Sequence, residues 1–224
     1  MLEMEALAFF LAGLPLVFVS NRLVVELTTF EEDLVERDDG RVLPWQQGAW
    51  PERVRWAILV LLPVAMAVAA SRFDLLQAMA VSLLVGALLI ITATDMLRFR
   101  VPNAVTYPAT VAALAAAVLM PNGSIGDALV AALLGGGLFF VLAIVTRGGI
   151  GLGDVKLAVL IGAALGLQIA YQALLYGVVA AAVVMGVLLV AGVVSRRQPV
   201  PYAPFLALAA IVTMLSQGAA FAPL

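Results

Sequence analysis

Long apolar runs, separated by short polar segments, make up most of this chain. The runs are Ala6–Asn21, Trp56–Ser71, Leu75–Thr94, Val101–Gly126, Ala128–Thr146, Leu157–Ser195 and Gln198–Leu224. A membrane-spanning helix needs about 20 predominantly apolar residues, so each run indicates one span, except that Leu157–Ser195, with 39 residues, indicates two. We expect the turn between these two helices near Leu167–Ala173. The pattern predicts an all-α, polytopic integral membrane protein with about eight transmembrane helices.

The composition agrees with a membrane protein and narrows its chemistry. Of the 224 residues, 64% are hydrophobic and 12% are charged, against about 25% charged in an average soluble domain. The chain contains no Cys and no His, which excludes disulfides, thiolate nucleophiles and imidazole bases. We expect no metal, no cofactor and no nucleic acid among its ligands.

The basic residues indicate the orientation, because Lys and Arg accumulate in cytoplasmic loops. With eight spans and both termini on the outer side, eleven of the twelve Lys and Arg residues fall on the cytoplasmic side, and only Arg72 falls outside. We therefore expect a multi-pass protein of the inner (plasma) membrane, surrounded by lipid. Residues 1–21 then form the first transmembrane helix, residues 22–55 a short cytoplasmic loop with an acidic run at Glu31–Asp39, and residues 56–224 a seven-helix core.

The predicted core contains four acidic residues, and two of them fall together on the cytoplasmic side. Asp74 and Asp127 fall on the outer side, each just before a span, where a carboxylate suits a helix N-terminus. Asp95 and Asp154 lie at the cytoplasmic ends of two spans. Ionisable groups beside membrane spans are costly, so this pair indicates a functional site. The alternative is that both are helix-end caps paired with neighbouring Arg and Lys residues.

The surroundings of the two aspartates favour a site that water can reach. The segment Gly148–Gly153 before Asp154 holds four glycines, and non-helical backbone at this depth is tolerated where protein buries it or water reaches it. Two carboxylates can activate a water together, one ionised as base and one protonated as acid. Asp154 opens a helix and Asp95 closes one, so the helix dipoles favour Asp154 as the base and Asp95 as the acid.

Three segments carry a family resemblance. Asp95 precedes Val101-Pro102-Asn103, Gly151-Leu152-Gly153-Asp154 is followed by Lys156, and a PYAPFLA run covers Pro201–Ala207. Together they resemble the type IV prepilin peptidases, polytopic aspartyl proteases of the GxGD class. That family carries one Asp before an (I/V)PN element, a second Asp in GxGD followed by Lys, and a PFGPFLA run.

The resemblance, which extends from Leu75 to the end of the chain, implies an aspartic endopeptidase. Such an enzyme removes the basic leader peptide from type IV prepilins or pseudopilins at the cytoplasmic membrane face. It implies catalytic roles for Asp95 and Asp154. The residues implied to support them in the active-site loops are Gly151, Gly153, Lys156, Pro102 and Asn103. Pilus prepilins and secretion or competence pseudopilins are equally compatible as substrates.

This chain departs from the family pattern in two places, and the first separates it from the bifunctional members. Those members bind zinc through two CxxC pairs in the first cytoplasmic loop, and this site is linked with N-methylation of the new N-terminus. Without a cysteine this zinc site cannot form, so we expect peptidase activity without N-methyltransferase activity. The run Glu31–Asp39 is then either a docking segment for the basic leader or a solvated loop. The second departure is Ala203, which stands where the family has glycine.

Two other classes of function remain as alternatives. A small proton- or cation-coupled transporter could use Asp95 and Asp154 as carriers, but transporters place such groups near the bilayer midplane on broken helices. Both aspartates are predicted at the inner membrane edge, which favours the protease. A catalytically inactive assembly factor is the third possibility.

Overall fold

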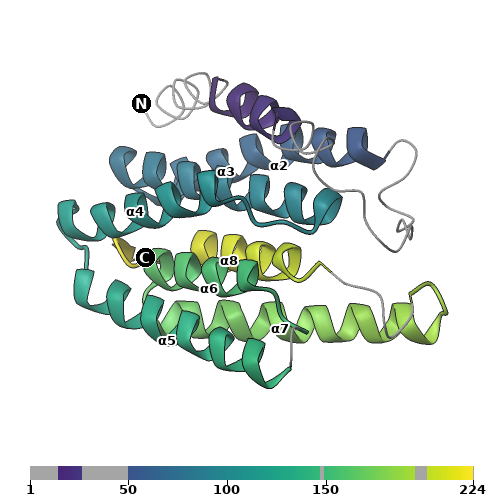
Figure 1. The fold of residues 1–224 in the computed structure, drawn as a ribbon. Helices are drawn as coiled ribbons and strands as arrows, with labels where there is room; N and C mark the ends of the chain where they lie inside the picture. Colours follow the sequence, from purple (N-terminus) through teal and green to yellow (C-terminus); the bar gives the residue numbers. More distant parts are fainter. Residues whose placement is uncertain (1–14, 27–49, 147–148, 195–200, 224) are drawn as a thin grey trace.

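The computed structural model describes residues 15–26, 50–146, 149–194 and 201–223, which form eight helices and one short hairpin (Figure 1). The first helix covers residues 15–26. The others are α2 Trp50–Arg72, α3 Leu75–Arg98, α4 Asn103–Leu119, α5 Ile125–Val145, α6 Leu152–Leu165, α7 Leu167–Val190 and α8 Ala203–Gln217, followed by β1 Gly218–Ala219 and β2 Ala222–Pro223. The predicted all-α, polytopic membrane fold is confirmed.

Four of the described helices are long and apolar enough to cross a membrane. They are Glu52–Arg72 within α2, and α3, α5 and α7 over their full lengths. The helices α4, α6 and α8 are shorter, with 17, 14 and 15 residues. The number of spans and the outer position of the termini therefore stay predictions.

Helical structure extends into the predicted first cytoplasmic loop from both sides. The first helix continues past Asn21 to residue 26, and Arg22 and Glu26 form an ion pair of 3.0 Å across its last turn. An Arg and a Glu four residues apart lie on one face of a helix and support it. On the other side, α2 begins at Trp50 rather than at Trp56.

The turn between α6 and α7 lies at Gly166, before the predicted position of Leu167–Ala173. Gly166 has a φ of 74°, in the left-handed region that glycine adopts without steric cost. Its neighbour Leu167 donates its backbone N–H to Asp127 Oδ2 at 3.1 Å. Asp127, expected to suit the start of its own span, thus also caps the N-terminus of α7, and this contact fixes the turn.

The predicted last span, Gln198–Leu224, is wrong in extent, because a hairpin follows α8. Gly218 ends the helix with a φ of 104°. The hairpin then bonds to two other parts of the chain, since Ala220 donates to Ala164 O at 2.9 Å and accepts from Ser124 N at 3.1 Å. The C-terminal segment therefore joins the end of α6 to the start of α5. In the same way, α4 ends before Pro121 rather than continuing to Gly126.

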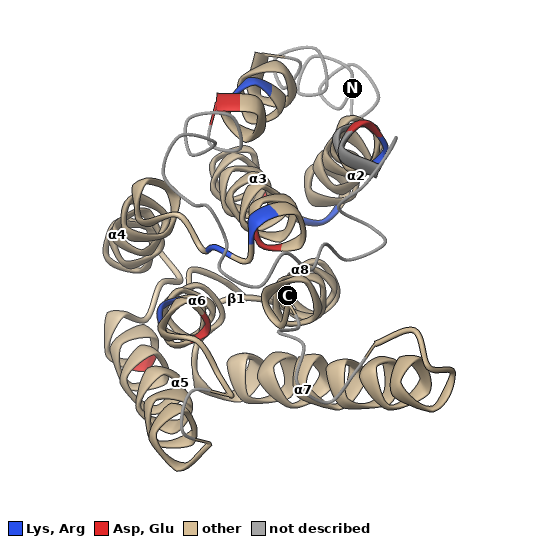
Figure 2. Ribbon diagram, turned by 45° about the vertical axis from the view of Figure 1, so that its right-hand side comes forward, with Lys and Arg blue, Asp and Glu red and all other residues tan. Residues whose placement is uncertain are grey.

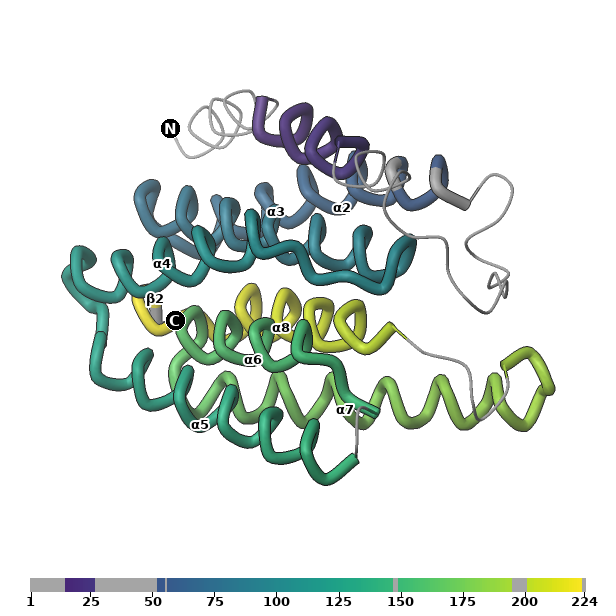
Figure 3. The backbone as a smooth tube through the Cα atoms, viewed as in Figure 1, coloured from purple at the N-terminus to yellow at the C-terminus, as the bar shows by residue number. Residues whose placement is uncertain are grey.

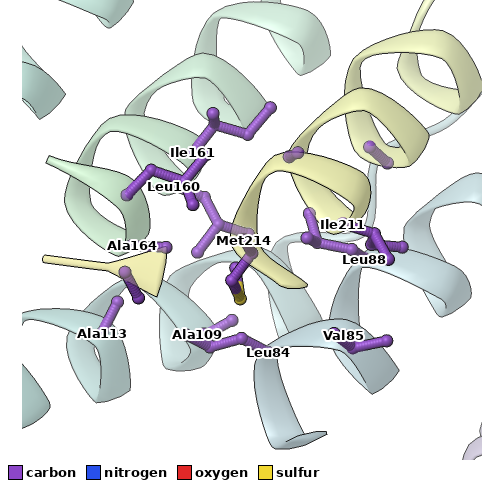
Figure 4. Packing of buried hydrophobic residues seen from close by; sticks show 14 of the residues in the cluster. Leu84, Val85, Leu88, Ala109, Ala113, Leu160, Ile161, Ala164, Ile211 and Met214 are labelled. Carbon is purple, nitrogen blue, oxygen red and sulfur yellow. The ribbon is translucent and has the colours of Figure 1, made fainter. Parts of the chain in front are cut away.

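One core lies between α3, α4, α6 and α8. Figure 4 shows Leu88 of α3, Ala109 of α4, Ile161 of α6 and Met214 of α8 pointing into it, and all four are buried. The remaining helices pack outside this group, with α2 on α3, α5 on α6, and α7 on α8 (Figure 2). The central group of four helices is the one that carries the candidate site.

The helices α5 and α6 approach each other at backbone distance. A Cβ atom on Gly162 of α6 would overlap the backbone of Ala131, and one on Gly136 of α5 would overlap the Val159 side chain. A Cβ on Gly135 would lie 3.2 Å from the backbone oxygen of Ala158. Small residues at such positions let membrane helices pack closely, so these glycines set how near α6 lies to α5.

Consecutive helices run in alternating directions (Figure 3). The end of α3 and the starts of α4, α6 and α8 therefore lie at one end of the bundle. Most of the described basic residues also lie there, namely Arg22, Arg53, Arg98, Arg100 and Lys156, whereas Arg72 lies at the other end. We call the first of these the basic end.

We expect Gly162→Ala to lower the free energy of unfolding by about 1–3 kcal/mol, because the new methyl group overlaps the Ala131 backbone. Thermal unfolding in detergent measures the change. The matched control is Gly137→Ala, since a Cβ on Gly137 meets no atom within 4 Å, and alanine favours a helix over glycine. Equal stability of the two variants would contradict the close α5–α6 packing.

Candidate active site

The Asp95 carboxylate is held between two helices at the basic end. It lies in the last turn of α3 with 6% of its surface exposed. Its Oδ2 atom accepts a hydrogen bond of 3.2 Å from the backbone N–H of Ala203, the first residue of α8. A helix N-terminus presents unpaired N–H groups and a positive partial charge. The start of α8 therefore stabilises a negative charge on Asp95.

The Asp154 carboxylate is held at the start of its own helix. It lies in the first turn of α6 with 8% of its surface exposed. Its Oδ2 atom accepts a hydrogen bond of 3.2 Å from the backbone N–H of Gly151, the N-cap residue. Each aspartate thus uses one oxygen to accept an N–H from the start of a helix.

The two carboxylates lie close enough to repel each other electrostatically. Within the described residues, no Lys or Arg forms an ion pair with either carboxylate, and no protein donor bonds to either Oδ1 atom. Each carboxylate thus accepts an N–H at a helix end, as the interpretation of both aspartates as helix caps expects. The ion pairs with Arg or Lys that this interpretation also expects do not occur among the described residues. Among the residues that the structure describes, one oxygen of each carboxylate therefore has no protein donor.

A tight connection joins α3 to α4 beside this pair. Phe99 adopts a φ of 54° and donates its N–H to the backbone oxygen of Asp95 at 2.8 Å. Pro102 is the N-cap residue of α4, and its backbone oxygen accepts from the N–H of Thr106 at 3.0 Å. A non-glycine residue at positive φ is uncommon, and here it reverses the chain within a few residues of Asp95.

This connection rests directly on the first turn of α6. A Cβ atom on Gly153 would lie 3.0 Å from Cγ2 and 3.1 Å from Cβ of Val101, closer than ordinary van der Waals contact. Glycine at this position therefore allows the Val101 segment to approach α6. By contrast, a Cβ on Gly151 would lie 3.5 Å from Asp154 Oδ2, which is an ordinary contact.

A second contact joins the same elements. Lys156 of α6 donates from Nζ to Oδ1 of Asn103, the first residue of α4, at 2.8 Å. The same Nζ lies 5.7 Å from the centroid of the Tyr107 ring, within the range of a cation–π contact.

The structure brings all seven predicted site residues to the basic end. These residues are Asp95, Pro102, Asn103, Gly151, Gly153, Asp154 and Lys156. Sequence reasoning missed the contribution of Ala203, although the PYAPFLA run that contains it was a visible signal. Sequence reasoning also did not predict that Val101 packs on Gly153. No group of three or more His, Cys, Asp or Glu side chains that could hold a metal occurs in the described ranges.

An apolar groove elsewhere on the surface is separate from this site. It lies between α5 and α7, has a volume of about 300 Å³, and is lined by residues such as Leu138, Phe139, Tyr171 and Leu174. None of the predicted site residues lines it.

Fold and site together define a polytopic helical membrane protein with two buried, adjacent carboxylates at one end of the bundle. Residues 82–186 match the type IV leader peptidase family, and over this segment the chain is similar to that family. A prepilin leader peptidase/N-methyltransferase of Bacillus subtilis (strain 168) is 30% identical over 131 residues, which cover 58% of this chain and 53% of that protein. The chain thus spans about half the length of this curated relative. No solved structure matches the present chain.

We expect Gly153→Ala to lower thermal stability, because its methyl group would press on Val101 at about 3.0 Å. Adding Val101→Ala to this variant removes the opposing methyl groups and should restore part of the loss. Thermal unfolding in detergent measures both effects. Gly151→Ala is the matched control and should be close to neutral; if it were as harmful as Gly153→Ala, the packing explanation would be wrong.

Proposed function

We propose that this protein is an aspartic endopeptidase that cleaves the leader peptide from type IV prepilins or pseudopilins. The observation that carries the proposal is the pair of buried carboxylates, Asp95 and Asp154, each with one oxygen held by a helix N-terminus. The match of residues 82–186 to the type IV leader peptidase family supports the same reaction.

In the proposed mechanism, the Oδ1 atoms of the two aspartates hold a water molecule between them. The ionised carboxylate takes a proton from this water as its oxygen attacks the scissile carbonyl carbon. The protonated carboxyl donates its proton to the carbonyl oxygen. The C–N bond of the tetrahedral intermediate then breaks. The leaving amine takes the proton that the first aspartate removed from the water, and the hydroxyl formed from the carbonyl oxygen returns its proton to the second aspartate. A carboxylic acid is released, and the pair again holds one shared proton. Two like charges this close resist simultaneous ionisation, so one shared proton is the favoured state.

We assign the base to Asp154 and the acid to Asp95. Asp154 lies only at a helix start, where the dipole of α6 favours its charged form. Asp95 lies at the start of α8 but also in the last turn of α3, and the negative end of α3 opposes the effect of α8. The balance of helix dipoles therefore favours charge on Asp154.

The proposed site lies at the cytoplasmic face of the inner (plasma) membrane. The basic end supports this orientation, because positively charged residues accumulate on the cytoplasmic side. The substrate would present its basic leader to this end. The acidic run Glu31–Asp39, which we propose as a docking segment for the leader, lies outside the described residues.

We further propose that the chain lacks N-methyltransferase activity. The curated relative is named for both activities. This chain contains no cysteine, so it cannot supply the CxxC pairs that the family resemblance links with methylation.

We expect Asp95→Asn and Asp154→Asn each to lower the rate of prepilin cleavage by about 100- to 10,000-fold, since each removes one partner of the acid–base pair. Purified protein and a prepilin in detergent, with the product analysed by mass spectrometry, provide the measurement. The product should carry an unmethylated new N-terminus. Asp74→Asn is the control, because Asp74 is exposed and precedes α3 at the opposite end. Wild-type rates in either dyad variant would refute the mechanism.

We expect Ala203→Pro to lower the cleavage rate by about 10- to 100-fold. Proline is tolerated in the first turn of a helix, but it removes the N–H that bonds to Asp95. Asp95 becomes charged when it donates its proton during the reaction, and a hydrogen bond to a charged group contributes about 1.5–3 kcal/mol. Ala203→Gly keeps this N–H and should retain activity. If the proline and glycine variants cleave equally fast, the Ala203 N–H has no role in the reaction.

A further inference from the structure

Lys156 directs its charge away from the two aspartates. It follows Asp154 by two residues on α6, and residues at this spacing point to different faces of a helix. Its Nζ bonds to the neutral Asn103 amide at 2.8 Å and lies over the Tyr107 ring of α4. Within the described residues, no carboxylate lies within 4.0 Å of this nitrogen. Lys156 therefore contacts α4 and does not itself compensate a charge on Asp154.

Two contacts hold the corner between α3 and α4 against the first turn of α6. One is the packing of Val101 on Gly153, and the other is the hydrogen bond from Lys156 to Asn103. The first restricts the distance between these elements. The hydrogen bond from Lys156 to Asn103 lies farther along α4 and α6, and it restricts the rotation of these two helices about the contact of Val101 with Gly153.

This corner is mechanically linked to both carboxylates. Asp95 lies in the last turn of α3, directly before the connection that ends at Pro102. Asp154 lies in the turn of α6 that carries both contacts. A shift of the corner on α6 would therefore change the separation of the two carboxylates, and an error of about 1 Å in such geometry can lower a rate about 100-fold.

We propose that Lys156 is a positioning residue that, through its hydrogen bond to Asn103, sets the separation of Asp95 and Asp154. This inference rests on the proposed peptidase function. Lys156 acts on the reaction through α4 and does not touch the substrate. The same ammonium could instead bind a polar group of the substrate, and the two roles predict different kinetics.

The test measures kcat and KM for prepilin cleavage in Lys156→Met, Asn103→Leu and the double variant. We expect each single variant to lower kcat about 10- to 100-fold with KM little changed. The double variant should be no slower than the slower single variant, because both changes remove the same bond. Lys156→Arg keeps a donor and should recover most of the lost kcat. Thermal unfolding in detergent confirms that the variants are folded.

A covalent link provides a second, independent readout. Because the chain contains no cysteine, the double variant Asn103→Cys/Lys156→Cys can be joined by a short bis-methanethiosulfonate reagent without competing reactions. We expect the linker to raise kcat of this variant at least about tenfold, and a reducing agent to reverse the gain. The two single-cysteine variants treated with the same reagent are the controls.

Three results would overturn the proposal. A raised KM in Lys156→Met together with a neutral Asn103→Leu would place Lys156 on the substrate. Lowered thermal stability with unchanged kcat in both variants would reduce the contact to a structural one. Failure of the linker to raise kcat, with the protein folded, would also exclude a positioning role. Absence of cleavage by the wild-type protein would instead refute the peptidase function itself.

Discussion

The structure depends on the burial of two carboxylates at one end of an apolar bundle without a counter-ion among the described residues. A buried charge is unstable unless hydrogen bonds replace its lost hydration. Here the replacement comes from backbone N–H groups at helix starts, Ala203 for Asp95 and Gly151 for Asp154. The start of α8 must therefore lie against the end of α3, and the start of α6 must lie beside both. The arrangement of the central helices follows from this requirement.

Glycines make this arrangement of helices sterically possible at two places in the bundle. At the site, Gly153 lets the Val101 segment rest on α6, and at mid-helix Gly162 lets α6 approach the backbone of α5. The helix α6, with only 14 residues, is thereby packed between α4, α5, α7 and α8. At its far end Gly166 turns the chain, and Asp127 caps the next helix. The position of Asp154 is thus fixed by contacts along the whole of α6.

The sequence predicts the helical membrane fold and the pair of aspartates, because both can be recognised from long uncharged runs and from the few charged residues at their ends. An apolar run indicates a span, and a lone Asp at the end of a run indicates a site. Hydrophobicity could not locate the turn at Gly166 or the end of α8 at Gly218, since positive φ angles set both. It also could not predict the bond from Ala203 to Asp95. That donor is a backbone N–H, which every residue except proline carries, so the contact depends on tertiary packing.

The placement of the carboxylates also favours the proposed hydrolysis over ion transport as an explanation of the same residues. A coupled transporter binds its ion near the bilayer midplane, where half-helices end and leave backbone groups free. Here α3 is continuous up to Asp95 and α6 is continuous from Asp154, and the break at Gly166 lies at the opposite end of α6. Both carboxylates thus lie toward the basic end of the bundle, at the ends of continuous helices. An ion bound at this end would have crossed little of the membrane, whereas the proposed peptidase needs its two carboxylates at one face, so this placement favours the proposed hydrolysis over ion transport.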